Sequence, residues 1–179
     1  MTERPTAPRN STAVPEVLAA AVLGVGIALA LSALLLLTKI EGVSRLPMPL
    51  GAAFAAHLFG QATLGMKGLL AVGVGLHVGY VATATVLAVV VLGRRLGAVA
   101  AFGTALVLWV VAGLTVLPYV GWGLFGFRLG TPAALNVFVV HAVYGAFLWA
   151  GAWVASRSPT AGPSQVPATP SDARLAAQR

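Results

Sequence analysis

Four long runs of uncharged, mostly apolar residues dominate this sequence. They cover residues 17–38, 69–92, 96–117 and 133–155. Each run is long enough to cross the hydrocarbon core of a bilayer, because about 20 residues suffice for a helix that rises about 1.5 Å per residue. Only 8% of the chain is charged, whereas about a quarter is usual in soluble domains. The sequence therefore predicts an all-α, polytopic membrane protein with a bundle of four transmembrane helices.

The first run could also be read as a secretory signal peptide. Such a peptide has an apolar region of roughly 7 to 15 residues, followed directly by a small-residue cleavage site. The run at residues 17–38 is longer than that and leads into Lys39, Ile40 and Glu41. We therefore interpret it as a membrane helix. At the other boundaries, Pro118 predicts the end of the third helix, and Thr131 with Pro132 predicts the start of the fourth.

The remaining segments are connections and chain ends. Residues 50–58 form an apolar stretch that is too short to cross the membrane, so we expect it to lie at the interface or to re-enter. Residues 119–130 place aromatic side chains among glycines, which suits the level of the lipid headgroups. Residues 1–13 and 157–179 are expected to be disordered because of their polar, proline-bearing composition. The membrane domain is therefore predicted to be residues 14–156.

The distribution of Lys and Arg predicts the orientation. The N-terminal segment, the connection between the second and third runs, and the C-terminal tail carry seven basic residues, against four on the opposite side. The seven are Arg4, Arg9, Arg94, Arg95, Arg157, Arg174 and Arg179, and the four are Lys39, Arg45, Lys67 and Arg128. Because basic residues concentrate on the cytoplasmic side, we expect a multi-pass protein of the cell membrane with both termini in the cytoplasm.

A short motif occurs twice at similar places in the two halves. His77-Val78-Gly79-Tyr80 comes eight residues after the expected start of the second helix, and His141-Ala142-Val143-Tyr144 eight after the expected start of the fourth. The chain has only three His and three Tyr, so we interpret the match as a tandem duplication of a helical hairpin. The two copies would be related by an axis along the membrane normal. The alternative is a likeness of composition between two glycine-rich helices.

The last third of the chain also resembles a known class of proteins. The features that carry the likeness are Gly121-Trp122-Gly123-Leu124-Phe125-Gly126 and His141-Ala142-Val143-Tyr144-Gly145. With them the chain resembles the small, uncharacterised four-helix integral membrane proteins grouped as domains of unknown function. The resemblance implies a fold, but it implies no activity and no functional residue.

His77 and His141 are the main candidates for a functional site, because ionisable groups inside membrane spans are costly and often functional. One hypothesis makes them axial ligands of haem b, or ligands of a copper or zinc ion. Tyr80 and Tyr144 would support them, since each Tyr lies three residues on and hence on the same helix face. Small neighbours would admit a flat macrocycle; these are Gly73, Gly75, Gly79, Ala142 and Gly145. The alternative is that each His and Tyr makes an interhelical hydrogen bond.

Two further polar features lie outside this pair. His57 has Met48 and Met66 in the same connection, and together they could offer soft ligands to copper, although a solvated loop histidine explains His57 equally. Asn136 lies one turn into the fourth helix, and we expect it to make an interhelical or interface hydrogen bond.

The sequence lacks residues and motifs that several classes of function require. It has no Cys, no Asp, Glu, Lys or Arg in the middle of a run, and no nucleotide, hydrolase or metalloprotease motif. Its net charge of +7 is scattered over segment ends and forms no stripe for nucleic acid. We therefore expect a non-enzymatic membrane subunit that binds a small ligand or a membrane-protein partner, or forms a homodimer. The alternative is a haem- or metal-binding redox or sensor protein, and a permeation pathway comes third.

Overall fold

The computed structural model describes residues 14–157, and the regular structure in this part of the chain is helical. The helices are α1 (Val14–Ile40), α2 (Leu50–Phe59), α3 (Gln61–Leu92), α4 (Ala98–Val111), α5 (Leu117–Tyr119) and α6 (Thr131–Arg157). A π-helical turn, η2 (Ala112–Val116), joins α4 to α5, and two 3₁₀ turns are η1 (Gly93–Arg95) and η3 (Leu124–Leu129). The predicted disordered ends, apart from Arg157 in α6, lie outside the described residues.

Four of these helical segments are long and apolar enough to cross a membrane, as the sequence predicted. They are Glu16–Ile40, Gln61–Leu92, Ala98–Tyr119 and Thr131–Arg157. Only 22 to 28% of each apolar stretch is buried inside the molecule. Most of the apolar surface therefore faces outward, an arrangement that is stable in lipid but not in water. The short apolar stretch before α3 forms a separate helix, α2, which packs against α3.

α3, which contains the second of the predicted runs, begins earlier than expected. It starts at Gln61 because Gly65, with φ 61° and ψ 174°, kinks the helix without ending it. α6 begins at Thr131, close to its predicted start. His77 and His141 therefore do not lie at equal distances from the starts of their helices, so that count does not support the repeat. The hairpin duplication stays a prediction.

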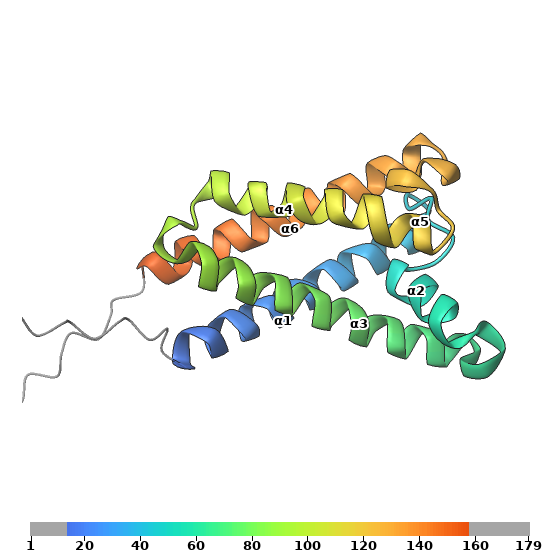
Figure 1. Ribbon diagram of the computed structural model, residues 1–179, viewed down its shortest axis with the longest axis horizontal. Coiled ribbons are helices and arrows are strands. Elements are labelled where there is room, and N and C mark those ends of the chain that lie inside the picture. Colours follow the sequence, from blue (N-terminus) through green and yellow to red (C-terminus); the bar gives the residue numbers. More distant parts are fainter. Residues whose placement is uncertain (1–13, 158–179) are drawn as a thin grey trace, which may run out of the picture.

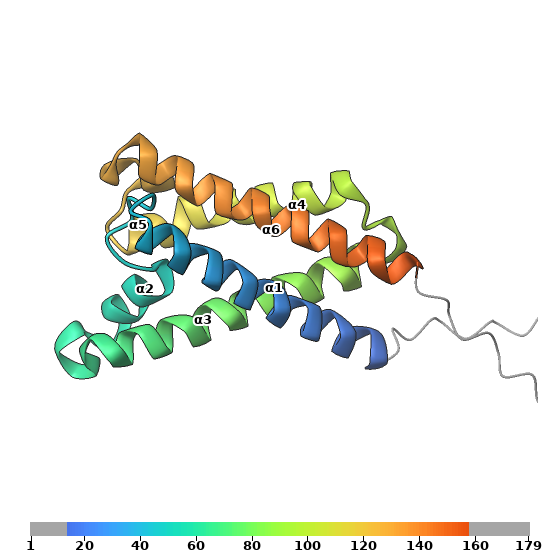
Figure 2. The same ribbon diagram turned by 180° about the vertical axis from the view of Figure 1, so that it is seen from behind.

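Each half of the chain forms a helical hairpin. α3 packs along α1 and α2, α6 packs along α4, and the two hairpins meet mainly between α1 and α6. α3 and α6 run in the same direction (Figure 1). Figure 2 shows the reverse side: α2, α5 and η3 gather at one end, here called the loop end, whereas α1 begins and α6 finishes at the other, the tail end. Asn136 near the loop end donates a hydrogen bond to Ser44, at 3.1 Å, as its position in the sequence suggested.

Glycines allow the helices of each hairpin to approach closely. A Cβ placed on Gly73 of α3 would lie 2.5 Å from the backbone nitrogen of Ala52 in α2. A Cβ on Gly24 of α1 would lie 2.7 Å from the Cα of Ala82 in α3. Such contacts are typical of membrane helices, where dispersion forces between close backbones replace the hydrophobic effect.

Candidate functional site

The two His-x-x-Tyr units lie on α3 and α6, one in each hairpin. Tyr144 of α6 reaches α3, because its hydroxyl lies 3.4 Å from Oγ1 of Thr85. Since α3 and α6 both start at the loop end and run in the same direction (Figure 1), each histidine lies nearer the loop end than its tyrosine. The two units therefore belong to different hairpins and have the same orientation along the bundle.

His141 has a defined tautomer. Its Nδ1 lies 2.8 Å from the carbonyl oxygen of Val137, one turn earlier in α6. A carbonyl oxygen can only accept, so Nδ1 carries the proton and donates it. In a neutral imidazole the other nitrogen, Nε2, then keeps its lone pair. Histidine ligands are commonly held in this way by a backbone carbonyl.

His77 has an unpartnered nitrogen in the interior of the bundle. Its Nε2 is buried and makes no hydrogen bond within residues 14–157. A buried polar nitrogen without a partner costs on the order of 1 to 3 kcal/mol, and no water from the hydrocarbon layer can replace the missing partner. This atom is therefore the strongest polar anomaly near the histidine pair.

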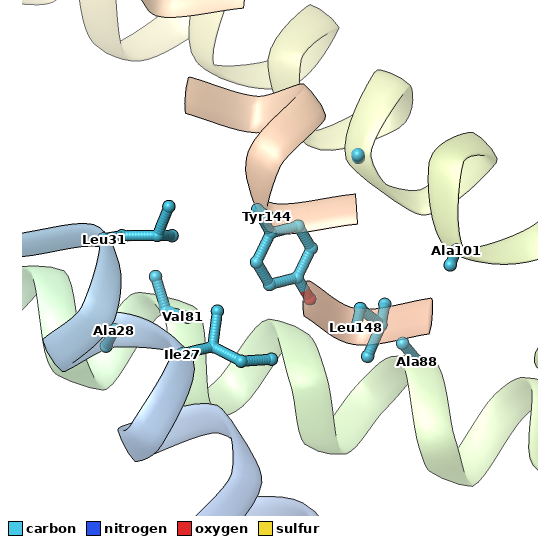
Figure 3. Packing of buried hydrophobic residues seen from close by; sticks show 9 residues of the cluster. Ile27, Ala28, Leu31, Val81, Ala88, Ala101, Tyr144 and Leu148 are labelled. Atoms are coloured by element: carbon cyan, nitrogen blue, oxygen red, sulfur yellow. The ribbon is translucent and has the colours of Figure 1, made fainter. Parts of the chain in front are cut away.

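Tyr144 connects the two hairpins. It is buried, and its hydroxyl lies 3.4 Å from Oγ1 of the fully buried Thr85 in α3. Thr85 in turn donates to the carbonyl oxygen of Val81, at 2.8 Å. Because the single hydroxyl proton of Thr85 is used in that bond, Tyr144 donates to Thr85. Figure 3 shows the Tyr144 ring among Ile27, Leu31 and Leu148, with its oxygen directed toward α3.

Tyr80 has different surroundings from Tyr144. Its side chain is 44% exposed, and it lines a hollow of about 290 Å³ between α3 and α4. The other lining residues are Gly79, Thr83, Ala84, Leu87 and Leu108. The hollow is mostly apolar and open to the lipid side, so it suits a hydrocarbon chain better than a polar group.

The small residues flanking the histidines do not form a slot between them. Gly73 is packed against α2, and a Cβ on Gly145 would lie 3.0 Å from Ala105 and Phe102 of α4. Gly75 and Gly79 are exposed and have no atom within 4 Å of an added Cβ. The glycines thus serve helix packing or face outward, contrary to the expectation that they surround a macrocycle.

His57 lies elsewhere, at the loop end. Its ring packs edge-on against Tyr119, with 4.7 Å between ring centroids. Together with Met48 it lines a second hollow, whereas Met66 does not and is 52% exposed. Only one of the two methionines considered as copper ligands therefore shares a site with His57. Within residues 14–157, no three His, Cys, Asp or Glu side chains form a metal-binding group.

Sequence reasoning missed an aromatic cluster around Trp109. The indole of Trp109 packs against Phe125 and Phe138, at centroid distances of 4.6 and 5.3 Å, and its Nε1 is buried without a hydrogen bond in the described part of the chain. Phe125 has a φ of 52° and lies directly over Gly113 in the π turn. Only the glycines around Phe125 hinted at this unusual turn.

Comparisons with models of protein families, with curated proteins and with solved structures found no match to this chain. The resemblance to uncharacterised four-helix membrane proteins therefore stays a prediction.

Proposed function

We propose that this chain is a non-enzymatic, four-span membrane protein that binds a small ligand through His77 and His141, where its two hairpins meet. The observation that carries the proposal is the buried Nε2 of His77, which has no partner within residues 14–157. A bundle gains nothing from such an atom by itself, because burial removes its hydration and returns no hydrogen bond. A ligand from outside the chain would supply the missing partner.

His141 offers the proposed site a second imidazole nitrogen. The bond from Nδ1 of His141 to Val137 leaves its Nε2 with a lone pair. Neutral imidazole nitrogens hold either a hydrogen-bond donor or a borderline metal ion. No carboxylate, lysine or cysteine occurs in the middle of the spans, so the pair has no obvious acid–base partner, which favours binding over catalysis.

A haem or a bare metal ion is the second candidate. The available lone pair on His141 and the unpartnered nitrogen on His77 favour it, because a bis-histidine haem needs two such axial ligands. Haem would require more rearrangement of the packing, because neighbouring helices already occupy the space beside Gly73 and Gly145. A small molecule or a single ion requires less rearrangement of this region than a macrocycle.

Ligand retention by the purified protein tests the proposal. Full-length protein from cells supplied with iron and haem precursor is examined by absorption spectroscopy, metal analysis and native mass spectrometry, and then titrated with Zn²⁺ and with hemin. We expect a co-purifying molecule, or one-to-one binding of one of the two probes. His77→Ala and His141→Ala should each abolish it, because both imidazoles contact the ligand.

His57→Ala is the matched control, because it removes the third histidine, which lies outside the pair. This variant should bind like the wild type. A wild-type protein that retains no molecule and binds neither probe would contradict the proposal, and so would equal losses in all three histidine variants. A Soret band that depends on both His77 and His141 would select haem as the ligand.

A further inference from the structure

A second hollow, of about 260 Å³, lies at the loop end, where residues 47–61 meet residues 120–122. Met48 comes from the connection after α1, His57 from α2, Gln61 from the start of α3, and Val120 and Trp122 from the connection after α5. Neither His77 nor His141 lines it. The hollow is therefore separate from the site between the hairpins.

Three hydrogen-bonding side chains line this hollow and are not used elsewhere. His57, Gln61 and Trp122 make no side-chain hydrogen bond to any other residue between 14 and 157. An indole offers only a donor, and an amide and a neutral imidazole each offer donors as well. Trp122 is only 6% exposed, and the His57 ring is held against Tyr119. Two of the three donors are thus fixed in place by their packing.

The charges around the hollow favour an anion. The ammonium group of Lys39 donates to the carbonyl oxygens of Leu46, at 2.7 Å, and Pro47, at 3.4 Å, and Pro47 is part of the hollow's wall. The connections at this end also carry Arg45 and Arg128, and among the described residues there the basic side chains outnumber the one acidic side chain, Glu41. No Asp or Glu lines the hollow. A copper ion held by Met48 and His57 would therefore sit in a positive field, which attracts anions and repels cations.

We propose that this hollow binds a phosphate group, carried either by an anionic lipid headgroup or by a small soluble phosphate. Three donor-bearing side chains in the lining match the several acceptor oxygens of a phosphate better than the two oxygens of a carboxylate. Met48 and Val120 contact the apolar part of the ligand. The volume lies just below the roughly 300 to 1,000 Å³ of sites for drug-sized molecules, so it suits a headgroup or a compound of similar size.

The chain contains only three His and four Trp, so isotope labelling of these two residue types gives few side-chain signals to distinguish. Full-length protein with ¹⁵N-labelled His and Trp side chains is prepared in phosphate-free maltoside micelles. It is titrated in separate arms with inorganic phosphate, with phosphatidylglycerol, and with sodium chloride at equal ionic strength. We expect saturable, one-site shifts of the His57 ring and Trp122 indole signals, while the signals of His77, His141 and Trp153 stay constant.

The arms distinguish the sources of the phosphate group. A response to inorganic phosphate indicates a soluble ligand, and a response to phosphatidylglycerol alone indicates a lipid headgroup. Gln61→Met, which keeps the size but removes the amide, should weaken binding about tenfold or more, as expected for loss of a hydrogen bond to a charged group. Thr63→Val, an exposed change on the same helix outside the hollow, should leave the affinity unchanged.

Four results would overturn the inference. The first is the absence of a saturable shift in both phosphate arms. The second is a shift that sodium chloride reproduces, because that indicates general screening of charge. The third is an unchanged affinity in Gln61→Met, because the donor set would then be incidental to binding. A one-site response to Ag⁺ but not to phosphate would likewise overturn it, and would reassign the hollow to a soft metal ion held by Met48 and His57.

Discussion

Thr85 is the residue through which the two hairpins share a polar contact. Its hydroxyl donates to Val81 within α3 and accepts from Tyr144 of α6, while its side chain is fully buried. In a lipid environment no water is present to replace either hydroxyl as a hydrogen-bond partner, so the Tyr144 hydroxyl depends on Thr85 for its hydrogen bond. The His-x-x-Tyr unit of α6 is in this way fixed to α3, whereas that of α3 has no equivalent anchor through the half-exposed Tyr80.

Removing either hydroxyl should therefore destabilise the bundle. We expect Tyr144→Phe and Thr85→Val each to lower the free energy of unfolding by about 0.6 to 1.7 kcal/mol, the range for interhelical hydrogen bonds in membranes. The double variant should cost less than the sum, because both changes remove one shared bond. Unfolding of the protein in mixed micelles by an anionic detergent measures these values.

Tyr80→Phe is the control, since this tyrosine belongs to the other copy of the motif and is 44% exposed. We expect little change in its free energy of unfolding. A loss as large as that of Tyr144→Phe, or strict additivity in the double variant, would show that the bond between Tyr144 and Thr85 contributes nothing.

At the scale of elements, the position of α2 depends on one glycine contact. Gly51 of α2 lies against the backbone of Gly73 in α3, and a Cβ on Gly73 would meet Ala52 at 2.5 Å and Gly51 at 2.7 Å. The neighbouring atoms are backbone, which cannot move aside as the end of a side chain can. α2 is too short to cross the membrane, so this contact determines how it lies along α3 and where His57 is placed.

Gly73→Ala should accordingly separate α2 from α3. We expect a loss of about 1 to 3 kcal/mol in the free energy of unfolding, the usual cost of overpacking, and faster hydrogen exchange in α2 while α4 and α6 keep their protection. Gly75→Ala, two residues on, has open space around the new methyl group. It should be neutral or slightly stabilising, because alanine favours the helix; equal damage by the two changes would argue against the α2–α3 contact.

At the scale of the whole molecule, four apolar segments return the chain to the end where it began. α1 begins and α6 finishes at the tail end, and α2, η3 and the connections around them lie at the loop end (Figure 2). At the tail end the guanidinium of Arg157 lies over the ring of Trp153, 3.7 Å from its centroid. An arginine next to a tryptophan is typical of the membrane interface.

The basic residues then predict which end faces the cytoplasm. Because the chain has no cysteine, single cysteines at Gly42, Gly130 and Ser156 can be labelled in intact cells with a membrane-impermeant maleimide. We expect labelling at Gly42 and Gly130, both at the loop end, and none at Ser156 until the cells are opened, because the seven basic residues of the other side stay inside. Labelling of Ser156 alone would invert the orientation, and labelling of Gly42 but not Gly130 would contradict the four-span arrangement.

The sequence by itself determined the helical class and the four apolar segments of this protein. Uncharged runs of this length have one stable form in lipid, a helix whose backbone groups are all paired internally. The sequence also singled out His77 and His141, since so few polar groups occur within the spans. It did not predict the kink at Gly65, because a glycine with positive φ can either end a helix or bend it.

Only the tertiary structure decided which small and polar residues meet. Gly73 and Gly145 lie at close contacts between helices, and Tyr144 donates a hydrogen bond to Thr85. His77 has a buried nitrogen with no hydrogen-bond partner between residues 14 and 157. Such contacts depend on how the helices rotate and cross. Almost every face of these helices is apolar, so periodicity along the chain carries little information about rotation. The sequence also did not predict the hollow around His57, Gln61 and Trp122, because it lies between two segments, residues 47–61 and 120–122, that are distant in the sequence.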